Sequence, residues 1–96
     1  MSTVVLDFYS ETCNPCKALL KDLTEISKDT PFKLEKLDIF ENYELTEKYG
    51  IRTVPTLVVL KDEQIKAVYS KYTGMIGLKK FIQENVWVTK KKYYLR

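Results

Sequence analysis

The sequence predicts a small α/β domain with the element order β-α-β-α-β-β-α, in which helices cover both faces of a four-stranded mixed sheet. Apolar, β-rich runs alternate with amphipathic stretches, and two of the crossovers between strands are helical. Strands joined through a helix run parallel, whereas the two-residue turn before the last strand predicts an antiparallel hairpin. The chain has 96 residues, of which 45% are hydrophobic and 30% charged. This length and composition suit one globular domain with one core.

The first half of the chain supplies two strands and two helices. Residues 4–9 (VVLDFY) form a nearly continuous apolar run, which is typical of a central strand buried on both faces. The amphipathic stretch that follows predicts a helix that ends at residues 29–31 (DTP). Residues 32–39 alternate as a second strand does. Residues 44–49 predict a short helix closed by Gly50, because glycine is common just past a helix C-terminus.

The second half supplies the hairpin and the last helix. Residues 56–61 form an apolar strand, residues 62–63 a turn, and residues 65–72 the partner strand. Gly74 precedes a final helix, whose predicted apolar face carries Leu78, Phe81, Ile82 and Val86.

We predict that the domain spans residues 1–86 and that residues 87–96 form a basic-aromatic extension. The extension holds four of the chain's 16 basic residues and no acidic residue, which leaves 12 basic against 13 acidic residues in the domain. The extension therefore carries a charge of +4 and the domain −1, which together give the net charge of +3. We expect no nucleic-acid-binding face on the domain itself, so any contact with nucleic acid would come through the extension.

The chain also excludes several classes of protein. No stretch approaches the roughly 18 consecutive apolar residues of a membrane span, and the N-terminus lacks the features of a secretory signal. We therefore expect a cytoplasmic monomer without a membrane partner. Two cysteines are too few for a disulfide scaffold, and without histidine most zinc sites are excluded. We expect no metal and no cofactor beyond a redox-active disulfide.

The two cysteines, Cys13 and Cys16, lie between the first strand and the first helix. A thiol at the first turn of a helix faces unpaired N–H groups and the positive end of the helix dipole, which favour the reactive thiolate. We predict that Cys13 attacks a substrate disulfide and that Cys16, which is more buried, resolves the mixed disulfide. Pro15 suits this first turn because it needs no N–H partner. The alternatives are a static disulfide and half of a zinc site.

Asp7 interrupts the first apolar strand. Strand alternation places it on one face with Val5 and Tyr9. A buried carboxylate has a raised pKa and can exchange a proton near neutral pH. Because Cys16 must lose a proton before it attacks, we predict that Asp7 serves as its base. The alternative is an exposed acid on an edge strand.

Several ordered segments resemble the thioredoxin superfamily, and within it the thioredoxins. Residues 4–17 (VVLDFYSETCNPCK) are similar to the active-site segment, with an acid six residues before the first cysteine. Residues 48–57 (KYGIRTVPTL) are similar to the cis-proline segment. Lys36 matches the lysine that neighbours the buried acid, and Gly74 matches a glycine on the substrate-facing surface. The resemblance covers about residues 4–85.

This resemblance implies a protein-disulfide reductase with a thioredoxin-like fold. It implies that Pro55 is cis, that Cys13 is exposed, and that substrates dock across Val54, Pro55 and Gly74. The implied partners are proteins that contain disulfides, together with a thioredoxin reductase-like enzyme or glutathione as the electron donor.

The chain departs from the thioredoxin pattern beside its cysteines. Thr12, which we place against the substrate, stands where thioredoxins usually have tryptophan, and Asn14, which supports the motif, stands where they have glycine. The trimmed N-terminus and residues 53–55 (TVP) are similar to glutaredoxins. The alternatives are therefore a glutathione-dependent oxidoreductase and a non-catalytic binding module. Four tyrosines are typical of ordinary packing aromatics: Tyr43, Tyr49, Tyr69 and Tyr72.

Overall fold

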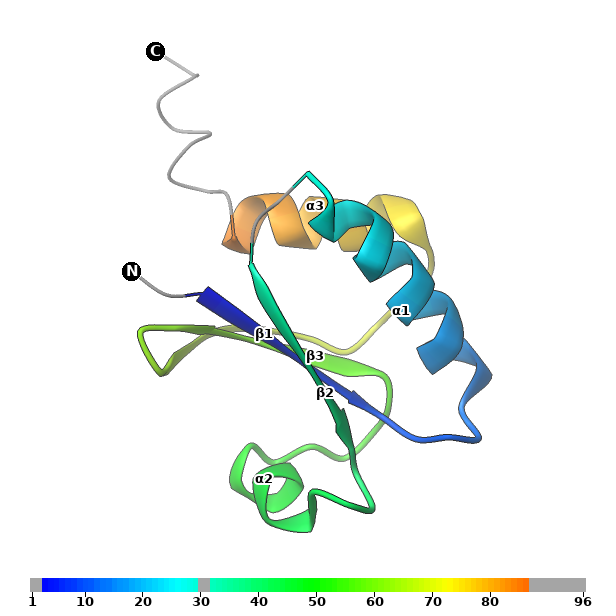
Figure 1. Ribbon diagram of the computed structural model, residues 1–96, viewed down its shortest axis with the longest axis vertical. Helices are drawn as coiled ribbons and strands as arrows, with labels where there is room; N and C mark the ends of the chain where they lie inside the picture. The colour runs from blue at the N-terminus through cyan, green and yellow to red at the C-terminus, as the bar shows by residue number, and fades with distance from the viewer. Residues whose placement is uncertain (1–2, 30–31, 87–96) are drawn as a thin grey trace.

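A central sheet lies between two helices on one face and one on the other (Figure 1). The computed structural model describes residues 3–29 and 32–86. The elements are β1 (Thr3–Tyr9), α1 (Asn14–Ser27), β2 (Lys33–Asp38), α2 (Tyr43–Lys48), β3 (Thr56–Lys61), β4 (Gln64–Tyr69) and α3 (Met75–Asn85). The sheet has the order β2-β1-β3-β4; β1 and β2 are parallel, and the other neighbouring pairs are antiparallel. The predicted mixed sheet and element order are confirmed.

The two faces of β1 contribute to two different apolar clusters. Leu6 and Phe8 pack with residues of β2 and β3 on the face that α2 covers. Val5 belongs to the larger cluster, which lies under α1 and α3. Because side chains alternate along a strand, Asp7 shares the face of Val5 and lies beneath α1. The buried residues of the larger cluster are Val5, Leu19, Leu23, Ile26, Leu57, Val59, Leu78 and Ile82.

Most element boundaries lie within one or two residues of the sequence prediction, and the largest difference is at the end of β4. Helix α1 ends at Ser27, before residues 29–31. Its last turn is closed by a backbone hydrogen bond of the 3₁₀ type, in which the Lys28 N–H donates to the Glu25 carbonyl, three residues back. Strand β4 ends at Tyr69, so the prediction that it runs to residue 72 is wrong. The predicted extension, residues 87–96, lies outside the described residues.

Two turns use backbone conformations with positive φ. Gly50 has φ 65° after α2, and the Ile51 N–H donates to the Thr46 carbonyl at 3.0 Å, which closes the helix as predicted. In the hairpin turn, Asp62 and Glu63 have φ values of 53° and 71°. Positive φ at both central residues matches the twist of the two flanking strands, although glycine or asparagine would adopt it more readily.

Candidate active site

Cys13 and Cys16 form a disulfide at the N-terminus of α1, with their Cα atoms 5.2 Å apart. Cys13 is the N-cap of the helix, and its Sγ accepts a hydrogen bond from the Cys16 N–H at 3.1 Å. Pro15 lies in the first turn, where its missing N–H leaves no bond unmade. Cys16 is only 3% exposed, whereas Cys13 is half-buried. Cys16 is the more buried of the two, as predicted, but the expectation that Cys13 is exposed is wrong, because Cys13 is half-buried. The helix end directs an N–H at this more accessible sulfur.

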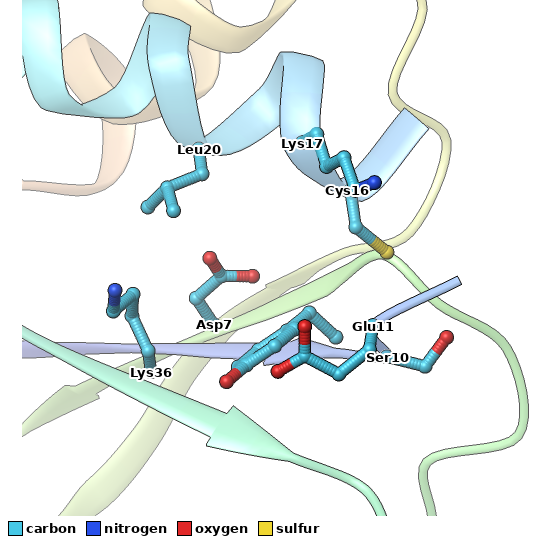
Figure 2. A pocket seen from close by; sticks show the side chains of 8 residues that line it. Asp7, Ser10, Glu11, Cys16, Lys17, Leu20 and Lys36 are labelled. Carbon is cyan, nitrogen blue, oxygen red and sulfur yellow. The ribbon is translucent and has the colours of Figure 1, made fainter. Parts of the chain in front are cut away.

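Asp7 lines a recess of about 210 Å³ between β1 and α1. Its side chain is 1% exposed, and neither carboxylate oxygen has a hydrogen-bond partner within residues 3–29 and 32–86. Figure 2 shows the carboxylate pointing toward α1 beneath Leu20, while Cys16 points from α1 toward the sheet. The residues that line the recess are Asp7, Tyr9, Ser10, Glu11, Cys16, Lys17, Leu20 and Lys36.

Burial sets the protonation of Asp7. Removal from water disfavours the charged carboxylate, which raises the pKa of Asp7 from 3.8 to about 6, and the positive charge of Lys36 offsets part of this increase. Asp7 is buried, as predicted, and its raised pKa allows the carboxyl group to take up or release a proton close to neutral pH.

Lys36 is the register partner of Asp7 on the neighbouring parallel strand. Its side chain lies beside Asp7 in Figure 2. Since the Asp7 oxygens accept no hydrogen bond from Lys36 or any other described residue, Lys36 acts on the acid through its charge rather than as a hydrogen-bonded ion pair.

The Val54–Pro55 peptide bond is cis, as the resemblance implied. Pro55 directly precedes β3, and Thr56 pairs with Phe8 near the carboxyl end of β1. The Thr56 hydroxyl, which is buried, donates to the Thr53 carbonyl at 2.6 Å and holds the turn before the proline. The cis-proline segment therefore lies at the edge of the sheet where the carboxyl end of β1 is found. The chain continues from this edge to Cys13.

Gly74 reaches the same edge from β4. Tyr69, the last residue of β4, pairs with Leu57, the second residue of β3. The chain then leaves the sheet and reaches Gly74, the N-cap of α3, whose φ of 136° and ψ of −178° are accessible essentially to glycine alone. The strand pairings thus bring the dithiol and the cis-proline to one edge, and the chain leaves β4 at that edge before it reaches Gly74.

Two further predicted site residues lie on either side of Cys13. Thr12 and Asn14 flank Cys13, and both are exposed.

Sequence reasoning missed Leu20 as the residue above Asp7, although its place in the helical apolar pattern could have indicated it. It also took Tyr43 for a packing aromatic, which is wrong because Tyr43 is 67% exposed.

Comparison with known proteins decides the family. The family model described as Thioredoxin matches residues 1–84. The chain belongs to the thioredoxin family. Among its relatives, a thioredoxin from Buchnera aphidicola is 37% identical over 88% of this chain and 81% of its own length. A thioredoxin from Pseudomonas aeruginosa is 35% identical over 86% of this chain and 79% of its own length.

Solved thioredoxin structures have the same fold. A mutant thioredoxin from Halobacterium salinarum has a TM-score of 0.80 and 30% identity, over 88% of this chain and 75% of that one. Thioredoxin from Fasciola hepatica has a TM-score of 0.79 and 26% identity, over 88% of this chain and 81% of that one.

Membership of the thioredoxin family, together with the Cys13–Cys16 disulfide, supports activity as a thiol-disulfide oxidoreductase and protein-disulfide reductase. Within residues 3–29 and 32–86, no group of three or more histidine, cysteine, aspartate or glutamate side chains could hold a metal ion. Across the same part of the chain, no helix combines the length and the apolar character needed to span a membrane.

Proposed function

We propose that the chain reduces disulfides of other proteins in two exchange steps, with Cys13 as the nucleophile and Cys16 as the resolving thiol. The observation that carries this assignment is the hydrogen bond from the Cys16 N–H to the Cys13 Sγ. In the reduced protein the same donor, together with the helix N-terminus, favours the Cys13 thiolate. Cys16 is only 3% exposed, so an external disulfide reaches it less readily than it reaches Cys13.

In the first step the Cys13 thiolate attacks one sulfur of the substrate disulfide. A mixed disulfide forms with Cys13, the substrate S–S bond breaks, and the other substrate sulfur leaves as a thiolate that takes a proton from solvent. In the second step the Cys16 thiol gives its proton to Asp7, and the resulting thiolate attacks the Cys13 sulfur. The second substrate thiolate leaves, and the Cys13–Cys16 disulfide forms. The substrate gains two electrons, which the protein loses.

Asp7 suits the second step because of where it lies and how it titrates. It lines the same recess as Cys16, and its pKa of about 6 leaves it mostly ionised, yet able to take up a proton, at neutral pH. The charge of Lys36 keeps this pKa from rising further.

The substrate docks across the edge where the three segments meet. We assign its contacts to Thr12, Val54, Pro55 and Gly74, since the strand pairings bring the cis-proline and the end of β4 to the edge where β1 ends. The cis bond presents the backbone of Val54 to an extended substrate segment, and Asn14 and Pro15 support the helix start.

We further propose a cytoplasmic monomer that needs no cofactor beyond its disulfide and takes electrons from a thioredoxin reductase-like enzyme. The competing donor is glutathione, favoured by the resemblance of residues 53–55 to glutaredoxins. Supplying the oxidised protein with each donor separately, and following substrate reduction, distinguishes the two.

The principal test is insulin reduction with a dithiol as electron source. Cys13→Ser should abolish turnover, whereas Cys16→Ser should also stop turnover but accumulate a mixed disulfide. Ala18→Ser, an exposed substitution on the same helix, is the matched control and should retain wild-type activity. Full turnover by Cys13→Ser would refute the assigned nucleophile.

A further inference from the structure

Tyr72 and Asp22 connect the loop after β4 to the helix that carries the dithiol. The Tyr72 hydroxyl donates a hydrogen bond to Asp22 Oδ2 at 2.6 Å, across 50 residues of sequence. Asp22 lies on α1, and Tyr72 lies two residues before Gly74. The Tyr72 ring also packs against the larger apolar cluster. The hydrogen bond therefore links helix α1 to the loop that follows β4, which is not paired in the sheet.

The Tyr72 hydroxyl keeps its proton throughout the neutral range. The hydrogen bond to Asp22 is the main cause that raises the pKa of Tyr72 to about 12, with a smaller contribution from burial. Tyr72 is therefore a constant hydrogen-bond donor to the helix.

Tyr69, the last residue of β4, contacts both the same loop and helix α3. Burial raises the pKa of Tyr69, and a hydrogen bond with the backbone of Thr73 offsets part of that effect. A Cβ atom at Gly77 would lie 3.5 Å from the Tyr69 hydroxyl, and the rings of Tyr69 and Phe81 are 4.8 Å apart. Tyr69 thus connects the loop to α3 through its contacts with Thr73 and Phe81, whereas Tyr72 connects the loop to α1 through its hydrogen bond with Asp22.

We propose that Tyr72 is a positioning residue, which through Asp22 holds the loop that carries Gly74 at a fixed place relative to Cys13. This inference rests on the proposed function, because it takes Gly74 to be part of the surface that protein substrates contact. A protein substrate must touch Cys13 and the loop at the same time. A small disulfide needs only Cys13, so the two kinds of substrate respond differently to a loosened loop.

Tyr72→Phe tests this role because it keeps the ring and removes only the hydroxyl. When the binding-competent arrangement is populated for only part of the time, apparent affinity falls by that fraction. We expect KM for insulin to rise on the order of fivefold, with kcat changed less than about twofold. Kinetics with the small disulfide cystine and the redox potential should be unchanged. Tyr43→Phe, at an exposed tyrosine on α2, is the matched control and should leave all these values unchanged.

Substitutions of the partner separate the hydrogen bond from general damage to the fold. Asp22→Asn retains an acceptor oxygen and should keep KM for insulin near the wild-type value. Asp22→Leu should raise KM as Tyr72→Phe does, and the double variant should be no worse than either single variant, because both remove the same bond.

Two results would overturn the inference while leaving the proposed function intact, provided that wild-type protein reduces insulin. The first is an unchanged KM in Tyr72→Phe, and the second is an equal loss of activity toward insulin and cystine. Wild-type protein that reduces cystine but not insulin would instead refute the proposed substrate class, and the positioning role with it.

Discussion

Replacing Asp7 with asparagine should raise the free energy of unfolding of the oxidised protein at neutral pH. This gain in stability should disappear in acid. Asp7 is 1% exposed and accepts no hydrogen bond from the described residues, so the charge of Lys36 offsets only part of the cost of burying its ionised form. Asparagine has nearly the same shape and never ionises. The substitution therefore removes the charge while keeping the packing around the recess.

The magnitude follows from the pKa of Asp7, which rises from 3.8 to about 6 on folding. A difference of one pKa unit corresponds to 1.36 kcal/mol, so the ionised acid destabilises the fold by about 3 kcal/mol. The sign is set by proton binding: between these two values the folded state holds the proton more tightly than the unfolded chain. Wild-type stability therefore falls as pH rises through this interval and stays lower above it.

Urea unfolding of both proteins at about pH 4 and about pH 7.5 measures the effect. The stability of Asp7→Asn relative to wild type should increase by about 2 kcal/mol from the lower to the higher pH, because part of the effect has already occurred at about pH 4, just above the unfolded-state pKa of 3.8. Any constant cost of burying the amide cancels in this comparison. Asp29→Asn, at an exposed acid just after α1, is the control and should show no such increase. An equal stability difference at both pH values would refute the reasoning about Asp7.

Three further substitutions test the fold by urea unfolding at neutral pH. Gly74→Ala should lower the free energy of unfolding by about 1–3 kcal/mol, because its φ of 136° strains any side chain, and unchanged stability would contradict that backbone conformation. Glu63→Gly should raise the free energy of unfolding by up to about 1 kcal/mol, because its φ of 71° suits glycine, and a loss of stability would show that the Glu63 side chain contributes more than the strain costs. Leu19→Ala should lower the free energy of unfolding by about 2–5 kcal/mol, because Leu19 is fully buried, and a loss below about 1 kcal/mol would place it outside the core.

Local patterns in the sequence account for most of the fold and for the centre of the site. The strand at residues 56–61 has the predicted bounds, because a proline precedes it and a turn follows it. Strand alternation placed Asp7 on the correct face, and the position of Cys13 before an amphipathic stretch predicted a thiol at a helix start. Each of these inferences needs only neighbouring residues.

Long-range pairing is what the sequence could not supply. Residues 65–72 stay rich in β-forming side chains, yet β4 ends at Tyr69, which pairs with Leu57 near the start of β3. The bond between Tyr72 and Asp22 spans 50 residues, and Asp22 taken alone is typical of a solvated helix position. Only the fold brings the two together.

Intact-mass analysis of a trapped intermediate tests the exchange mechanism most directly. Cys16→Ser, reduced and then mixed with a disulfide-containing peptide, should gain the mass of one peptide thiol, and fragmentation should locate the new bond at Cys13. Cys13→Ser, treated in the same way, should form no such adduct at a comparable rate, because Cys16 is buried. Rapid adduct formation at Cys16 in Cys13→Ser, with none at Cys13 in Cys16→Ser, would contradict the assignment of the nucleophile.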